Sequence, residues 1–116
     1  MIDHTSATRP NGLYGASKVW GEALARHFTD TSDLSILCLR LGHVTKDDRP
    51  GSARDQSVWL SHADVSKMIE LCVNAPDDLK FDVFYVVSNN PGNYRDLTHA
   101  QEVLGFEPQD SASDHA

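Results

Sequence analysis

Tyr14 and Lys18 stand four residues apart in the segment LYGASKVWGE, and they form the clearest chemical pattern in the sequence. In a helix, positions i and i+4 share one face, so the phenol and the ammonium group would lie about one turn apart. A nearby ammonium group lowers the pKa of a phenol, which is about 10 when free. Such a phenol can take a proton from an alcohol while a hydride leaves the same carbon for a nicotinamide ring. Taken alone, the spacing also fits two unconnected surface residues on a helix.

An amphipathic helix over residues 13–29 is predicted to carry this pair. Apolar side chains recur along it at steps of three and four, with charged side chains on another face. The apolar positions are Leu13, Trp20, Leu24 and Phe28. The residues between Tyr14 and Lys18 are small, which would let a flat cofactor approach the helix closely. The polar segment 1–12 ends in Pro-Asn-Gly and is predicted to be a loop.

Two apolar segments, 34–41 and 81–87, are predicted to be the strands of the fold. Both are nearly continuous in apolar residues, which is typical of parallel strands covered on both faces. Between them, a long polar loop over 43–56 precedes a second helix, which Ser61 and Asp64 would cap and Pro76 would end. A third helix is expected around 96–104, and the polar residues 109–116 are predicted to be a frayed tail.

This order of helices and strands predicts an α/β fold that contains part of a parallel sheet. Two parallel strands flanked by three helices leave at least one long apolar strand edge without a partner. We therefore expect residues 1–116 to form a single partial domain, incomplete as given.

Composition narrows the classes of partner. The 116 residues carry a net charge of −7 and contain no run of lysine or arginine, so nucleic acid and anionic membrane surfaces are not expected to bind. No apolar stretch approaches the ~20 residues that a spanning helix needs, and nothing near Met1 has the form of a signal peptide. A cytoplasmic location is the resulting expectation.

Other chemistries are disfavoured by spacing. Cys38 and Cys72 lie among apolar neighbours, which favours two buried, reduced thiols. The histidines show no metal-ligand spacing, so no metal site is predicted. Ser61, His62 and Asp64 have the composition of a hydrolytic triad, but neighbours on one short segment cannot adopt its geometry, and helix capping accounts for them.

Several motifs occur in a fixed order along the chain. They are the segments YGASK at 14–18, LRLG at 39–42, WLSH at 59–62 and LGFEPQD at 104–110. Together they resemble the C-terminal half of the extended short-chain dehydrogenase/reductase family, also called NAD-dependent epimerase/dehydratase. Within it the likeness is to the uronate dehydrogenases and to NAD-dependent glucose-6-phosphate dehydrogenases. The resemblance implies the C-terminal half of a Rossmann-like, doubly wound parallel sheet, with NAD as cofactor and NADP not excluded.

The resemblance also implies roles for five residues. Tyr14 would be the general base, and Lys18 would lower its pKa and hydrogen-bond the nicotinamide ribose. Val44 would contact the cofactor, His43 the substrate, and Arg54 would hold the anionic group of the sugar. Uronate dehydrogenases carry serine at the position of His43, so the histidine favours a phosphorylated or differently shaped sugar over a uronate as the substrate.

The implied reaction is the oxidation of a sugar acid or a sugar phosphate at C1 to a lactone. The sequence contains no GxGxxG pattern or relaxed form of it, and the catalytic serine of the family would lie upstream of Met1. We therefore expect the chain to be inactive by itself. Two alternatives remain open: a nucleotide-sugar epimerase or dehydratase, which would need a larger C-terminal region, and a non-catalytic half-domain. A protein partner of this chain would be a second copy in a homodimer or a separate chain that completes the sheet.

Overall fold

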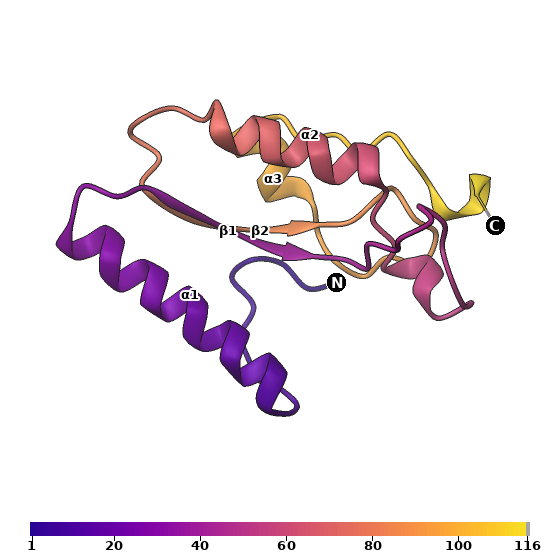
Figure 1. Cartoon of the computed structure of the whole chain (residues 1–116), viewed down its shortest axis with the longest axis horizontal. Helices are drawn as coiled ribbons and strands as arrows, with labels where there is room; N and C mark the ends of the chain where they lie inside the picture. Colours follow the sequence, from indigo (N-terminus) through magenta and orange to yellow (C-terminus); the bar gives the residue numbers. More distant parts are fainter. Residues whose placement is uncertain (116) are drawn as a thin grey trace.

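The computed structural model describes residues 1–115 and contains three α-helices and two parallel strands (Figure 1). Along the chain they are α1 (Leu13–Thr31), β1 (Ile36–Leu41), α2 (His62–Val73), β2 (Phe81–Val86) and α3 (Thr98–Leu104). Single turns of 3-10 helix lie at Asp55–Ser57 and Ala112–Asp114. The strands pair in register from Ile36 opposite Phe81 to Leu41 opposite Val86. The predicted α/β class and the parallel pairing are confirmed.

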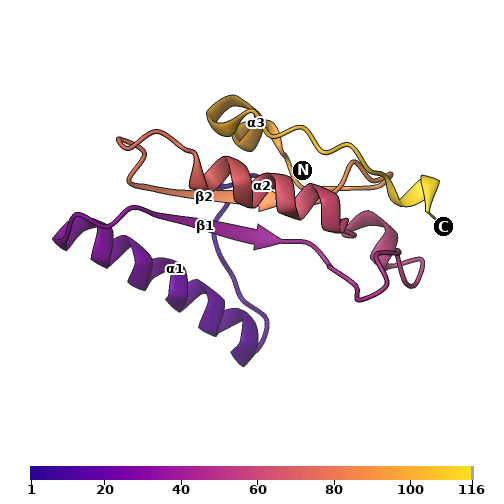
Figure 2. The same cartoon turned by 45° about the horizontal axis from the view of Figure 1, so that its top comes forward.

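The helices cover opposite faces of the two strands. In Figure 2, α1 lies on one side of the strands, and α2 and α3 lie on the other. The core forms on the α2 and α3 side, where Phe84 and Val86 of β2 pack with Met68 of α2 and Ala100 of α3. Because side chains alternate along a strand, the neighbouring Tyr85 faces α1 instead.

Helix α1 runs two residues beyond its predicted end, and side-chain hydrogen bonds explain why. The hydroxyls of Thr29, Thr31 and Ser32 donate to the carbonyls of Arg26, His27 and Phe28 respectively. These bonds satisfy groups that would otherwise lack partners in the last turns.

The prediction that both strands are covered on both faces is wrong for β1 within the described residues. Every residue of β1 keeps part of its surface exposed, and no residue of α1 is buried. Helix α1 contacts the sheet through an ion pair between Glu22 and Arg40 and through the Arg26 guanidinium, which lies 5.0 Å from the centre of the Phe81 ring of β2. The apolar side of α1 is therefore left open.

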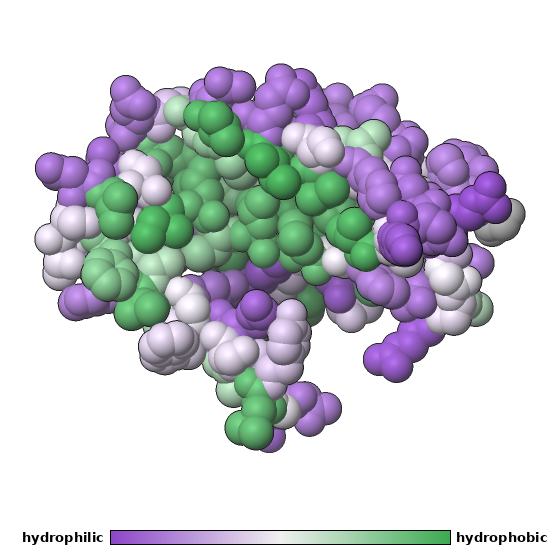
Figure 3. Space-filling view, in the orientation of Figure 1, coloured by the Kyte–Doolittle hydropathy of each residue, from purple (hydrophilic) through white to green (hydrophobic). Residues whose placement is uncertain are grey.

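One edge of β1 and the surfaces beside it form a continuous apolar face. Figure 3 shows hydrophobic side chains gathered across the middle of the view, over β1 and between α1 and α2. The exposed apolar residues of these elements include Trp20 and Phe28 of α1, Leu41 of β1, and Ile69 and Val73 of α2. Within residues 1–115, β1 has β2 as its only strand partner. The unpaired strand edge expected from the sequence is present.

The prediction of a frayed tail over 109–116 is wrong for residues 109–115, which dock onto the body of the fold; residue 116 lies outside the described residues. The backbone N–H groups of Gln109 and Asp110 donate to the carboxylate of Asp64, 2.8 and 3.2 Å away. Ala112 is fully buried, and its N–H donates to the side chain of Asn90. Polar composition suggested fraying, but these acceptors on distant parts of the chain hold the segment.

Both cysteines are free and half-buried, and burial raises the pKa of each thiol. Nothing among residues 1–115 groups three or more side chains of the kinds that hold a metal ion. Likewise, none of the helices in this range has the length and apolar character required to cross a membrane.

Candidate functional site

Tyr14 and Lys18 lie together in the first turns of α1. Their spacing places the Lys18 ammonium 5.1 Å from the centre of the Tyr14 ring, and the Tyr14 side chain is largely exposed. Gly12, with a φ of +112°, turns the chain into the helix, and its carbonyl accepts from the N–H of Ala16. The expected shared face of the pair is present.

The pair borders a hollow between α1 and the end of β1, which we call the helix hollow. Its volume is about 790 Å³. Tyr14, Lys18 and Trp20 line it from α1, and Gly42 and Val44 line it from the segment after β1. Val44 therefore shares one space with the tyrosine and the lysine.

A second space, which we call the loop hollow, lies beside the first. It has a volume of about 610 Å³, and both His43 and Arg54 line it. Leu41 and Gly42 line both hollows, so the two spaces meet at the carboxyl end of β1. Open α/β sheets bind their ligands at this end of the strands. The five predicted site residues thus divide between two adjoining hollows.

Gly42 allows the chain to pass between the two hollows. A Cβ atom at this position would overlap the carbonyl oxygen of Val58 and lie 2.8 Å from a methyl group of Val87. Only glycine leaves room for this approach. The next residue is then fixed on both sides, because His43 donates its N–H to Val58 and accepts from the N–H of Leu60.

Asp55 is a residue of the loop hollow that sequence reasoning missed. Its carboxylate accepts hydrogen bonds from the backbone N–H and the hydroxyl of Ser52, and lies 3.5 Å from Nδ1 of His43. The Ser52 hydrogen bonds, and to a lesser extent His43, hold the pKa of Asp55 below its ordinary value. The carboxylate therefore orders the turn that precedes the 3-10 helix and orients the histidine ring.

Tyr94 and Arg95 also line the loop hollow, and no sequence motif had marked either residue. They lie in the segment between β2 and α3, and the first residues of the chain hold them in place. The N–H of Ile2 donates to the carbonyl of Tyr94, and the N–H of Asp96 donates to Ile2. The guanidinium of Arg95 lies 4.6 Å from the centre of the Tyr94 ring.

An ion pair orients α1, and with it Tyr14 and Lys18, relative to β1. Two nitrogens of Arg40 each lie 2.8 Å from an oxygen of the Glu22 carboxylate, and a third lies 3.2 Å from the hydroxyl of Tyr85. The Glu22 carboxylate raises the pKa of Arg40 above its already high ordinary value. Such two-pronged contacts fix orientation as well as distance.

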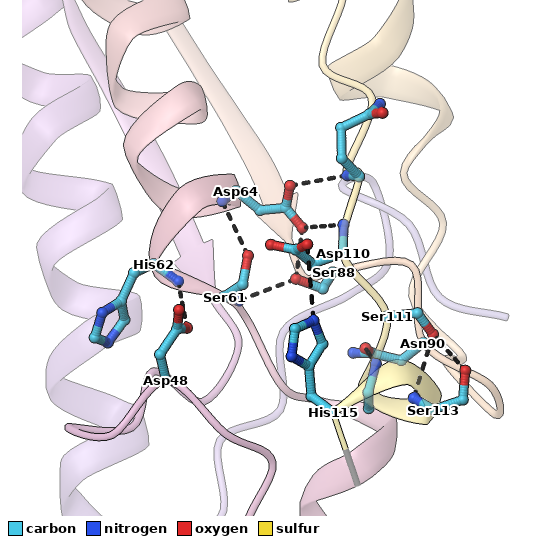
Figure 4. A network of polar contacts seen from close by, with 12 residues as sticks. Asp48, Ser61, His62, Asp64, Ser88, Asn90, Asp110, Ser111, Ser113 and His115 are labelled. Carbon is cyan, nitrogen blue, oxygen red and sulfur yellow. Dashed lines mark hydrogen bonds and ion pairs between the residues drawn. The ribbon is translucent and has the colours of Figure 1, made fainter.

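Asp64, at the start of α2, joins three separate parts of the chain, as Figure 4 shows. Besides the two N–H groups of the C-terminal segment, its carboxylate accepts a hydrogen bond of 2.6 Å from the hydroxyl of Ser88. The same hydroxyl accepts from the N–H of Ser61, while the Ser61 hydroxyl caps α2 by accepting from the N–H of Asp64. The predicted cap is confirmed, and the Asp64 carboxylate ties α2 to the segment after β2 and to the C-terminal segment.

The hydrolytic alternative finds no support in this geometry. The ring of His62 contacts the carbonyl of Thr45 at 2.6 Å, and its backbone N–H donates to Asp48. Ser61 is fully buried and is engaged in the cap. No nucleophile and base are therefore paired at the start of α2.

Comparisons with known proteins fit this geometry. The chain is 36% identical over 114 residues to the NAD-dependent glucose-6-phosphate dehydrogenase of Haloferax volcanii, a match that covers 97% of this chain and 43% of that protein. It is 38% identical over 104 residues to the uronate dehydrogenase of Agrobacterium fabrum, covering 90% of this chain and 38% of the relative. The crystal structure of uronate dehydrogenase from Agrobacterium tumefaciens superposes with a TM-score of 0.88 at 34% identity. The chain is homologous to uronate dehydrogenase and to NAD-dependent glucose-6-phosphate dehydrogenase.

This homology confirms the resemblance drawn from the sequence motifs. The fold matches part of the Rossmann-like structure of uronate dehydrogenase, covering 97% of this chain and 41% of that one. A tyrosine-to-alanine variant of the same enzyme, complexed with NAD, matches equally well. The chain spans about two fifths of the length of the curated relatives it matches. No protein-family model matches it.

Proposed function

We propose that this chain forms the substrate-binding portion of an NAD-dependent sugar oxidoreductase, which oxidises a sugar acid or a sugar phosphate at C1 to a lactone. The observation that carries the proposal is the meeting of two hollows at Gly42. One hollow holds a phenol beside an ammonium group, and the other holds an imidazole and a guanidinium. The oxidation of an anionic sugar would use the first hollow to remove the hydroxyl proton and the second to hold the anionic group.

The residues of the helix hollow fit the nicotinamide end of NAD. Lys18 offers N–H donors for ribose hydroxyls, and Val44 adds an apolar contact across the hollow. When bound there, the nicotinamide would accept the hydride from C1. NADP remains an alternative, because the residues that choose between the two belong to a part of the fold outside this chain.

Tyr14 and Lys18 would carry out the proton transfer. The phenol oxygen accepts the proton of the C1 hydroxyl as the C1–H bond breaks and the C1–O bond becomes a carbonyl. Negative charge on the phenol oxygen is stabilised by the Lys18 ammonium, which lies over the ring. Arg54 binds the anionic group of the sugar, and His43, held by Asp55, contacts the sugar ring.

The uncovered apolar face gives the remaining cofactor-binding portion a place to dock. It follows the free edge of β1, where a parallel sheet would continue. The homologous enzymes are more than twice as long as this chain, so they contain enough further sequence to cover this face. We propose that the chain is inactive until such a portion is present.

A fusion protein tests the proposal. This chain replaces the matching region of the Haloferax volcanii NAD-dependent glucose-6-phosphate dehydrogenase, and NADH formation is followed with glucose 6-phosphate, glucuronate and glucose. We expect sugar-dependent NADH formation by the fusion and none by the chain alone. Lys18→Met should lower the rate at least ~100-fold, as expected for loss of acid–base machinery. Lys67→Met, at an exposed lysine of α2, is the matched control and should leave the rate unchanged.

Each contrary result points elsewhere. A folded fusion without sugar-dependent activity would favour a non-catalytic half-domain. Activity that survives Lys18→Met at full rate would show that the assigned pair is not the catalytic one.

A further inference from the structure

The strongest observation outside the proposed reaction is a second arginine in the loop hollow. Arg54 and Arg95 line the same space, although they lie 41 positions apart in the sequence. We propose that the two guanidinium groups together form a binding site for a phosphate monoester, with Arg95 as the residue that selects phosphate over carboxylate. The inference deepens the proposed function and rests on it, because it names the substrate class of that site as a sugar phosphate.

Neither guanidinium is neutralised by another described residue. Within residues 1–115, no carboxylate forms an ion pair with Arg54 or Arg95. The Nη1 atom of Arg95 is buried and has no hydrogen-bond partner in that range. Buried donors without a partner are rare, and each calls for a specific acceptor. An oxyanion brought into the hollow would reduce the unbalanced charge of both side chains.

The acidic residue of the hollow does not fill this role. Asp55 adjoins Arg54 in the sequence, but its carboxylate is engaged by Ser52 and by the ring of His43. The lining therefore carries two unpaired positive charges in a protein whose net charge is −7. Such a local concentration of charge favours anions over neutral sugars.

The number of charges distinguishes phosphate from carboxylate. A carboxylate carries one negative charge and two oxygens, which one guanidinium satisfies with a bidentate contact. A phosphate monoester carries a charge of about −1.5 to −2 at pH 7 and three terminal oxygens, so it can bind two guanidinium groups. The hollow, at about 610 Å³, is also large enough for the attached sugar, since ligand pockets typically span about 300–1,000 Å³.

The proposal is tested by calorimetric titration of the chain itself, without NAD and without catalysis. The probes are glucose 6-phosphate, glucuronate and glucose, and the variants are Arg54→Gln and Arg95→Gln. The control is Arg26→Gln, an exposed arginine of α1 that pairs with Asp30. We expect the wild-type chain to bind glucose 6-phosphate about tenfold or more tightly than glucuronate, as a second charged contact implies.

The two arginine variants should differ in a specific way. Arg54→Gln should weaken the binding of both anions. Arg95→Gln should weaken glucose 6-phosphate about tenfold and glucuronate less than about threefold, because the carboxylate needs only one guanidinium. Arg26→Gln should change neither. If Arg95→Gln unfolds the chain, Arg95→Lys replaces it and should give an intermediate loss for the phosphate alone.

Three results would overturn the inference. They are an unchanged affinity for glucose 6-phosphate in Arg95→Gln, equal losses for the phosphate and the carboxylate, and no measurable binding of glucose 6-phosphate by the wild-type chain. Because these titrations need no hydride transfer, they are independent of the test with the fusion protein. An inactive fusion with intact phosphate selectivity would refute the proposed oxidation and leave the phosphate site standing. An active fusion together with no phosphate preference in the titrations would support the proposed oxidation and refute the phosphate site.

Discussion

Replacing Asp64 with alanine is expected to detach the C-terminal segment from the body of the fold. Asp64 is 3% exposed, and its carboxylate accepts three hydrogen bonds, from the Ser88 hydroxyl and from the N–H groups of Gln109 and Asp110. The serine hydroxyl can rotate to another acceptor, but the two backbone donors cannot. A hydrogen bond to a charged group contributes about 1.5–3 kcal/mol, so Asp64→Ala, which removes two such bonds that the backbone cannot replace, should lower the free energy of unfolding by about 3–5 kcal/mol.

Asp64→Asn provides a graded comparison. The amide keeps the shape of the side chain and one accepting oxygen, while its NH₂ group cannot accept. One or two of the three hydrogen bonds are lost, which should cost about 1–3 kcal/mol. The free energy of unfolding should therefore fall more for Asp64→Ala than for Asp64→Asn.

Tryptophan fluorescence during urea unfolding measures the effect. Trp59 is fully buried and lies 5.2 Å from the ring of His115 in the C-terminal segment, whereas Trp20 is exposed. A Trp20→Phe background leaves Trp59 as the single reporter. With a urea dependence of about 1–3 kcal/mol per molar, a loss of 3 kcal/mol should move the midpoint down by at least ~1 M.

Asp48→Asn is the matched control. Asp48 also accepts a hydrogen bond near the start of α2, from the N–H of His62 (Figure 4), but unlike Asp64 it is only half-buried. Asparagine tolerates its φ of +57°, so the free energy of unfolding should change by less than ~1 kcal/mol. If Asp64→Ala costs no more than this control, the reasoning about the buried carboxylate is refuted.

Three further predictions concern stability and titration. Gly42→Ala should lower the free energy of unfolding by more than ~2 kcal/mol, because the added methyl group meets the Val58 carbonyl. Gly21→Ala is the control and should raise the free energy of unfolding by ~0.5–1 kcal/mol, because its methyl group meets nothing within 4 Å. Equal stabilities of the two variants in urea unfolding would contradict this. Burial raises the pKa of Cys38 and Cys72, so both thiols should alkylate slowly at pH 8 and much faster in urea, as mass spectrometry would show; equal rates in the two conditions would be inconsistent with burial. The pKa of Asp55 is lowered in the folded chain, so its carboxylate stabilises the fold above the ordinary value of 3.8, and this contribution is lost as the pH falls through the folded-state pKa. The amide resonance of Ser52, which reports on the carboxylate, should therefore titrate below pH 3.8. A midpoint above 3.8 would refute the Ser52 contact.

Local patterns predicted the elements of the fold well. The periodic apolar residues of α1 and the apolar runs of β1 and β2 identify these elements, and Ser61 marks the start of α2. Their ends differ by about two residues where side chains intervene, as the hydroxyls after Thr29 do. These features depend on neighbours within a few positions, which a sequence displays directly.

Contacts between distant residues were not predictable in the same way. Asp64 binds the segment at Gln109 and Asp110 across 45 and 46 positions, and nothing in that polar segment announces its acceptor. Glu22 and Arg40 meet across 18 positions, and Arg95 joins the loop hollow only because β2 ends beside β1. The sequence motifs named the candidate residues for chemistry, while the fold revealed the residues that hold them in place.

In the proposed reaction, Tyr14 removes the proton from the sugar hydroxyl. The most direct measurement is the rate of NADH formation by the fusion protein and by its Tyr14→Phe variant, at saturating sugar and NAD and with folding verified by Trp59 emission. Phenylalanine keeps the ring beneath Lys18 and removes only the oxygen. We expect the rate to fall at least ~100-fold, because a general base is lost, with little change in sugar affinity. A Tyr14→Phe variant that turns over at the rate of the parent would contradict this role of Tyr14.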